Sequence, residues 1–145
     1  DLQNPTSKMS KSAESDAGVL WMLDDPAKSA KKIMRAVTDN EGSVRFDRES
    51  KPGVSNLLTI YAALSGRQVA SIEDEYAGRG YGDFKKGLAE VVVSEFEPVR
   101  TRALELLDDP AELDRILADN AGRADAVADA TLAQVYDRVG LLRRV

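Results

Sequence analysis

The chain has 145 residues, 43% of them hydrophobic and 31% charged, with a net charge of −5 at pH 7. These values fit one or two globular domains, and no apolar run approaches the ~20 residues of a membrane-spanning helix. The absence of cysteine and histidine excludes disulfides, thiol chemistry and the commonest general base, so any catalysis must rest on charge stabilisation.

The acidic excess is unevenly distributed along the chain. Residues 1–60 hold 9 basic and 9 acidic residues, whereas residues 61–145 hold 11 basic and 16 acidic ones. A pI near 4.8 argues against indiscriminate nucleic-acid binding, which needs clustered Lys and Arg. RNA binding through a local basic patch stays open.

The first quarter of the chain predicts a loop, a short strand and a helix. Residues 1–17 are polar, and the apolar run 19–23 that follows is typical of a short buried strand or an extended segment. Asp25 then caps a helix with Pro26 at its first position. We expect this helix to span residues 26–36. Its buried stripe is Ala30, Ile33, Met34 and Val37, and its remaining surface carries Lys28, Lys31, Lys32 and Arg35.

The middle of the chain is divided by glycine and proline. Residues 38–52 predict a loop with one short strand at 44–47. An apolar helix follows from Val54 to a left-handed stop at Gly66. Ser71 and Asp74 resemble a capping box, which predicts a short helix that Gly78 ends.

The last part of the chain predicts two long helices. Apolar residues at steps of three and four over residues 82–107 indicate a helix of roughly 40 Å, bent between Ser94 and Pro98. Asp109 and Pro110 start a final helix that we expect to fold back as an antiparallel hairpin. The predicted fold class is therefore mainly α: a helical bundle with a long helix hairpin, preceded by a polar loop and a short strand.

Residues 8–12 read Lys-Met-Ser-Lys-Ser and are the strongest candidate for chemistry. Lys/Ser-rich pentapeptides near chain ends often belong to solvated tails. Two ammonium groups three residues apart, with small hydroxyls between them, would also suit a polyphosphate whose charge shifts during reaction. The segments that follow favour the second interpretation.

These segments are Leu-Asp-Asp-Pro at 23–26, Ala-Val-Thr-Asp at 36–39 and Gly-Val-Ser-Asn-Leu-Leu at 53–58. Together with the KMSKS loop (residues 8–12), they resemble the C-terminal half of the bacterial tryptophanyl-tRNA synthetases, which are class I aminoacyl-tRNA synthetases. The resemblance covers essentially the whole chain. It implies that residues 1–25 end a catalytic domain and that residues 26–145 form a helical domain that binds the tRNA anticodon region.

The resemblance also implies a chemistry for the loop. ATP-dependent formation of tryptophanyl-AMP releases pyrophosphate, and Lys8 and Lys11 would be the catalytic residues that stabilise its charge. Met9, Ser10 and Ser12 would complete the ATP contacts. Mg²⁺ would be bound through ATP, and we identify no protein metal site.

Partners and location also follow from the resemblance. The implied partners are tRNA(Trp), ATP and tryptophan in a cytoplasmic homodimer. The Rossmann-type catalytic domain, with its histidine-containing signature, would lie upstream and provide the dimer contact. The 145 residues alone are then expected to be inactive.

Lys85 and Lys86 are candidates for tRNA contact, because they lie beside aromatic residues at a helix start. The alternative for both is a solvated helix start. Trp21 is interpreted as packing, the acidic pairs at 24–25 and 108–109 as helix caps, and the glycines at 78–82 as a pivot rather than a phosphate loop.

Two other functional classes stay open from the sequence. The chain could be a stand-alone helical RNA-binding module that kept the loop by descent, and the length of the upstream reading frame would discriminate this from an enzyme. A helical interaction protein without an RNA role would bind no tRNA.

Overall fold

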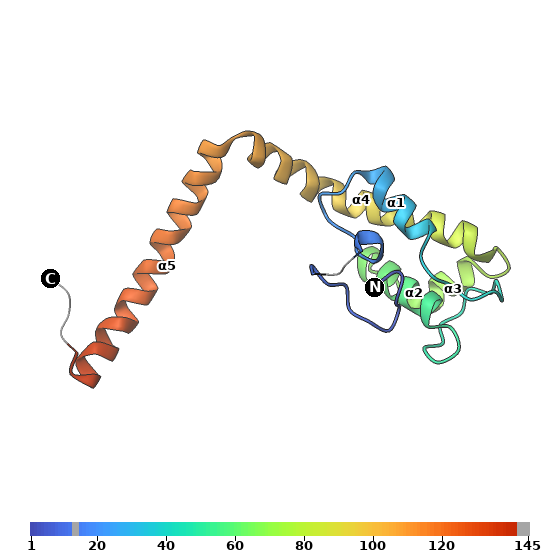
Figure 1. Cartoon of the computed structure of the whole chain (residues 1–145), viewed down its shortest axis with the longest axis horizontal. Helices are drawn as coiled ribbons and strands as arrows, with labels where there is room; N and C mark the ends of the chain where they lie inside the picture. Colours follow the sequence, from blue (N-terminus) through green and yellow to red (C-terminus); the bar gives the residue numbers. More distant parts are fainter. Residues whose placement is uncertain (13–14, 142–145) are drawn as a thin grey trace. The chain divides into compact units, whose positions relative to one another are not determined.

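The structure, a computed structural model, describes residues 1–12 and 15–141. It divides into two compact units, Asp1–Arg102 and Ala103–Val145. In the described part, the elements are η1 (Asp16–Gly18), α1 (Pro26–Met34), α2 (Pro52–Ser65), α3 (Val69–Glu75), α4 (Gly80–Asp108) and α5 (Pro110–Val139) (Figure 1). The mainly α fold is as predicted.

Several helix ends were correctly predicted from single residues. The Asp25 carboxylate accepts a hydrogen bond from the Ala27 amide at 2.8 Å, and Pro26 opens α1. Gly66 ends α2 with a φ of 68°, a left-handed conformation that costs glycine little. Asp109 caps α5 by accepting from the Glu112 amide at 3.1 Å. Proline and capping residues therefore predicted the starts of α1 and α5 and the end of α2 to within two residues.

The predicted strands at 19–23 and 44–47 are wrong, since the described residues contain helices and irregular segments but no strand. Neither segment has a neighbouring strand to pair with. The Phe46 amide donates to the Glu73 carboxylate, and the Asp47 amide donates to the Ser55 hydroxyl at 2.8 Å. Side chains therefore satisfy backbone groups that a sheet ladder would otherwise pair.

The start predicted for α3 is also wrong. The helix begins at Val69 rather than after Ser71, and no side chain caps its first turn. The Ser71 hydroxyl instead accepts from the Arg67 guanidinium at 3.3 Å. Arg67 also forms an ion pair with Glu75 at 2.6 Å, so that side-chain pairing spans this short helix.

The core of the first unit lies between α1, α2, α3 and the first half of α4. The Phe84 ring is fully buried and packs against Tyr61 at 6.2 Å and Tyr76 at 5.5 Å between ring centroids. The predicted stripe of α1 is only partly buried: Ile33 is enclosed, but Met34 and Val37 are almost half exposed. The other buried core residues are Leu2, Val19, Ala36, Val44, Val54, Leu57, Leu58, Ile72, Leu88, Ala89 and Val92.

The second unit contains the end of α4 and the 30-residue α5. None of the described side chains of α5 is buried, and Leu117 and Val127 of its predicted apolar stripe are 58% and 72% exposed. The antiparallel hairpin and the bend at Pro98 stay predictions. Among the described residues, no helix is both long and apolar enough to cross a membrane.

Candidate functional site

The segment 36–39, which we call the junction segment, organises the candidate site. The Val37 amide donates to the Leu2 carbonyl at 2.9 Å, and the Leu2 amide donates to the Gly18 carbonyl at 2.9 Å. Leu2 is itself 1% exposed. The two ends of the polar loop, one on each side of residues 8–12, are therefore held together and fixed to the junction segment.

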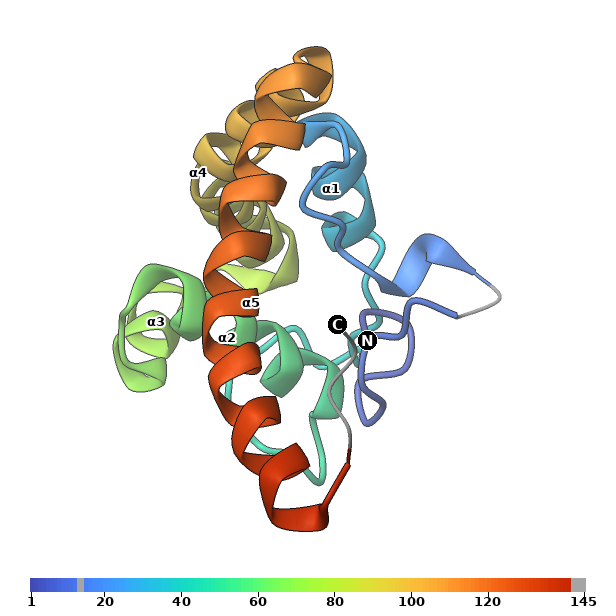
Figure 2. The same ribbon diagram turned by 90° about the vertical axis from the view of Figure 1, so that its left-hand side faces the viewer.

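Two further hydrogen bonds hold the start of this loop. The Asn56 amide group of α2 donates to the Asp1 carbonyl at 3.1 Å, and the Gln3 side chain donates to the Arg35 carbonyl at 3.1 Å. Figure 2 shows the N-terminal segment, in dark blue, beside α2 and below α1. Both ends of the loop are therefore anchored to the surrounding fold.

The KMSKS loop itself presents charge to solvent. Lys8 and Lys11 are exposed, and no ion pair to either is found in the described part of the chain. The Ser10 and Ser12 hydroxyls lie 3.2 Å apart, and the Ser12 amide donates to Ser10 Oγ at 3.3 Å. Met9 is half-buried and packs against the core. The loop thus combines an apolar anchor with two exposed ammonium groups, a donor set that suits a polyphosphate.

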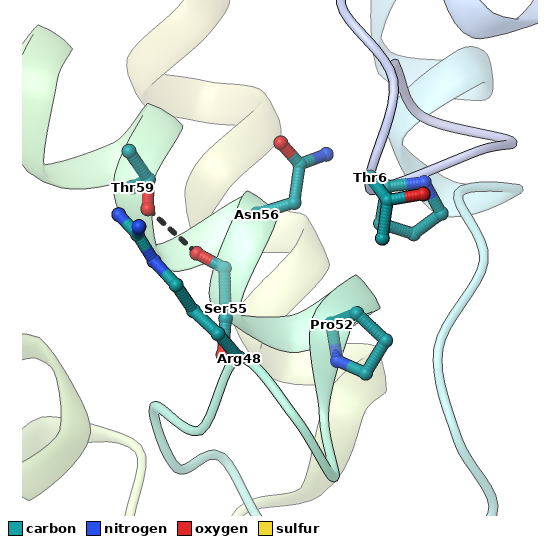
Figure 3. Close-up of a pocket in the computed structure, with 7 residues that line it drawn as sticks. Thr6, Arg48, Pro52, Ser55, Asn56 and Thr59 are labelled. Carbon is teal, nitrogen blue, oxygen red and sulfur yellow. Dashed lines mark hydrogen bonds between the residues drawn. The ribbon is translucent and has the colours of Figure 1, made fainter.

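A hollow of about 380 Å³ lies beside Pro5 and Thr6, shortly before the KMSKS loop in the sequence. In Figure 3 the Arg48 side chain runs along Ser55 towards Thr59, while Thr6 stands on the other side of the hollow. The Thr59 hydroxyl already donates to the Ser55 carbonyl at 2.7 Å. The hollow is lined by Pro5, Thr6, Arg48, Pro52, Ser55, Asn56 and Thr59.

An ion-pair network joins the segment after the loop to α1. Asp16 contacts Lys28 at 2.8 Å and Lys32 at 2.9 Å, and Asp24 contacts the same two lysines at 2.8 and 2.7 Å. Hydrogen bonds from both lysines lower the pKa of Asp16. Burial alone would raise the pKa of Asp24, but the same two donors outweigh it and lower this pKa as well. Asp24 is thus an ion-pair partner and not the helix cap that the sequence predicted; Asp25 provides the cap.

A second network, which sequence reasoning missed, surrounds Lys51. This side chain is 1% exposed, and its ammonium group lies 3.1 Å from Asp39, 2.7 Å from Glu41 and 3.0 Å from the Tyr81 hydroxyl. Burial would raise the pKa of Asp39, but hydrogen bonds from Tyr81, the Glu41 amide and Lys51 outweigh it and lower the pKa to about 2. No sequence signal could have found this network, because Asp39 and Tyr81 lie 12 and 30 positions from Lys51.

The two lysines proposed to contact tRNA lie in different surroundings. Lys85 is 8% exposed, and its ammonium group donates to the Ala36 carbonyl at 2.7 Å and to Thr38 Oγ1 at 3.2 Å. Burial lowers its pKa. This geometry argues against Lys85 as a phosphate ligand, since it instead ties α4 to the junction segment. Lys86 is exposed and stays a candidate.

Comparison with known proteins identifies the family. The family model described as tRNA synthetases class I (W and Y) matches residues 1–97, which is more than half of the chain. The chain belongs to this family. The family's matched region includes the KMSKS loop, the junction segment and both ion-pair networks.

Individual relatives agree with this assignment. The chain is 64% identical over 143 residues to a tryptophan–tRNA ligase of Leifsonia xyli, covering 99% of the chain and 42% of the relative. It is 54% identical over 142 residues to the tryptophan–tRNA ligase of Mycobacterium leprae, covering 98% and 41%. A crystal structure of tryptophanyl-tRNA synthetase from Mycoplasma pneumoniae is similar with a TM-score of 0.83 at 32% identity, over 99% of this chain and 45% of that one. The chain therefore spans less than half the length of these relatives.

Proposed function

We propose that the chain is the C-terminal part of a tryptophan–tRNA ligase, which activates tryptophan with ATP and transfers it to tRNA(Trp). The observation that carries the proposal is the KMSKS loop, which has two exposed ammonium groups and whose flanking segments are held by backbone hydrogen bonds. It occurs in a chain that is 64% identical to a relative named tryptophan–tRNA ligase. The relatives named above are more than twice as long as this chain, so the proposal concerns a larger protein than these 145 residues.

The proposed role of the loop is electrostatic. When the carboxylate of tryptophan attacks the α-phosphate of ATP, negative charge grows on the departing pyrophosphate. Lys8 and Lys11 would meet that charge, while Ser10 and Ser12 would supply hydroxyl or amide contacts and Met9 the packing anchor. An interaction made mainly in the transition state raises the rate without tightening ground-state binding, which suits a loop that moves on a fixed base.

The remaining parts of the proposal concern the whole protein. Mg²⁺ would accompany ATP without protein ligands from this chain, and the helical region would contact the anticodon part of tRNA(Trp). We further propose a cytoplasmic homodimer whose contact lies in the N-terminal domain, and that the 145 residues alone do not catalyse. A stand-alone RNA-binding module would bind tRNA in the same way, but would have no activity to lose.

The test is Lys11→Ala in the complete enzyme. We expect kcat for adenylate formation to fall about 10²-fold, the scale of one lost electrostatic donor in a transition state. Pyrophosphate exchange measures this step without tRNA. Because Lys11 has no partner among the described residues that would be left unpaired, the thermal stability is expected to stay unchanged.

The matched control is Arg45→Ala, which removes an exposed cation that already has a partner, Asp47 at 3.0 Å. Exchange should stay at the wild-type rate in this variant. If Lys11→Ala exchanged pyrophosphate as fast as the control, the catalytic role of the loop would be refuted. If the complete protein showed no exchange at all, the stand-alone module would be the better explanation.

A further inference from the structure

Helix α1 concentrates positive charge that the ion-pair network neutralises only in part. Between Pro26 and Met34 it carries three lysines and no acidic residue, and Arg35 follows directly. Lys28 and Lys32 are bound by Asp16 and Asp24. In the described part of the chain, the charged groups of the exposed Lys31 and Arg35 have no hydrogen-bond or ion-pair partner.

These two side chains line a hollow of about 410 Å³ on the surface of the first unit. Four cations and the carboxylate of Asp16 line it, and Asp24 binds two of these cations, Lys28 and Lys32. The six side chains leave a net charge of +2, located on Lys31 and Arg35. The remaining lining residues are polar or small: Gln3, Ser15 and Ala17.

The excess charge at the hollow is local. The first unit, residues 1–102, contains 15 basic and 16 acidic residues, so it has almost no net charge to attract an anion from a distance. Residues 31 and 35 are one helical turn apart and therefore lie on the same face of α1. A pair of unneutralised cations on one face of a nearly neutral unit marks a binding surface for an anion with more than one charged group.

The chemistry of the lining favours the backbone of RNA. The Arg35 guanidinium can bind a phosphate through two parallel hydrogen bonds, and the Lys31 ammonium can act as a point charge on a neighbouring phosphate. No aromatic side chain lines the hollow, and stacking on aromatic rings is how proteins usually hold unpaired bases. Such a surface would position an RNA strand through its phosphates rather than recognise its base sequence.

We propose that Lys31 and Arg35 form a contact surface for the phosphate backbone of tRNA. This inference rests on the proposed function, from which the identity of the RNA is taken. The ion pairs of Asp16 and Asp24 support it indirectly, because they neutralise Lys28 and Lys32 and because Asp16 joins η1 to α1, two elements that line the hollow.

The experiment compares tRNA binding by the complete protein and by the double variant Lys31→Gln/Arg35→Gln. Filter binding is measured with tRNA(Trp) and with a non-cognate tRNA at several salt concentrations. We expect both affinities to fall about tenfold near 0.1 M salt, and the slope of log K against log salt to become shallower by about 2, one for each lost phosphate contact.

The matched control for the single variant Lys31→Gln is Arg45→Gln, which removes one charge from an exposed loop arginine that is already paired with Asp47. Its affinity and salt slope should stay near the wild-type values. Lys31→Gln alone should give about half of the change in slope. Thermal melts of all variants establish that each is folded.

Three results would overturn the inference: an unchanged affinity and slope, an equal loss in the control, or a loss confined to tRNA(Trp), which would indicate base reading. None of these would affect the proposed role of Lys11 in pyrophosphate exchange. If the unaltered protein bound no tRNA, both this inference and the tRNA-contacting part of the proposed function would fail, while exchange would still test the catalytic part.

Discussion

Gly53 lies where two of the diagnostic sequence segments meet. A Cβ atom at this position would collide with the carbonyl of Val37, and Cα of Thr38 is also close, at 3.2 Å. Gly53 opens the segment 53–58, and Val37 belongs to the junction segment 36–39. The glycine is therefore required by the close approach of the first turn of α2 to a backbone that also holds the base of the KMSKS loop.

We predict that Gly53→Ala lowers the free energy of unfolding by about 1–3 kcal/mol, the usual cost of overpacking against a backbone that cannot yield. Chemical denaturation measures this change. Gly82→Ala is the control, because this helical glycine has open space around its Cβ position and alanine favours helix. A Gly53→Ala variant as stable as wild type would show that the junction segment shifts freely.

At the scale of elements, the sequence predicted helices far better than it predicted their connections. Local signals explain the success: Asp25 with Pro26, and Gly66, act within one turn of the helix end that they define. The segment 44–47 alternates like a strand, but a strand also needs a partner, and its amides are taken by Glu73 and Ser55 instead.

In the candidate site, too, contiguous sequence signals could be predicted, whereas contacts between distant residues could not. The KMSKS loop could be found from the sequence because its five residues are contiguous. The pairing of Lys51 with Asp39 and Tyr81 joins residues 12 and 30 positions apart, and a lysine gives no sign in the sequence that it will be buried. The burial of Lys85 could not be predicted for the same reason: its ammonium group is bound by the carbonyl of Ala36, which only the folded chain brings within reach.

The neighbouring carboxylates that precede α1 have separate roles, and substitution should separate them. Asp25→Ala removes a cap and should lower the free energy of unfolding by about 1 kcal/mol. Asp24→Ala should cost more, because Lys32 is only 7% exposed and would lose one of its two carboxylate partners. Urea denaturation of both variants measures the difference, and equal losses would contradict the assignment of the cap to Asp25 alone.

At the scale of the whole molecule, the two units differ in how their helices are stabilised. The first unit has a continuous core and two ion-pair networks, each built on a buried lysine, Lys32 or Lys51. In the second unit, the described part of α5 has exposed ion pairs such as Arg115 with Glu112 and Asp119. Exposed pairs contribute little to stability. We therefore expect amide hydrogen exchange to be slow in α2 and in the first half of α4, and faster along α5.

The networks of the first unit also make its stability depend on pH. The pKa of Asp39 is about 2, and those of Asp16, Asp24 and Glu41 are lowered by their lysine partners. A carboxylate with a lowered pKa in the folded state contributes stability that is complete above its ordinary pKa near 4 and is lost as the pH falls through the folded value. The melting temperature should therefore be nearly constant from pH 7 to pH 5 and fall steeply between pH 4 and pH 2.

The variant Asp39→Asn tests how much of this fall in melting temperature is due to Asp39. The variant should melt at a lower temperature than wild type at pH 7, because Lys51 and Tyr81 lose an ionised partner. It should then lose less on acidification, since the group that takes up a proton near pH 2 is gone. The two melting curves should thus approach each other as the pH falls from 4 to 2. Parallel curves over this range would mean that Asp39 does not titrate with unfolding, and would contradict the ion pairing assigned to the junction segment.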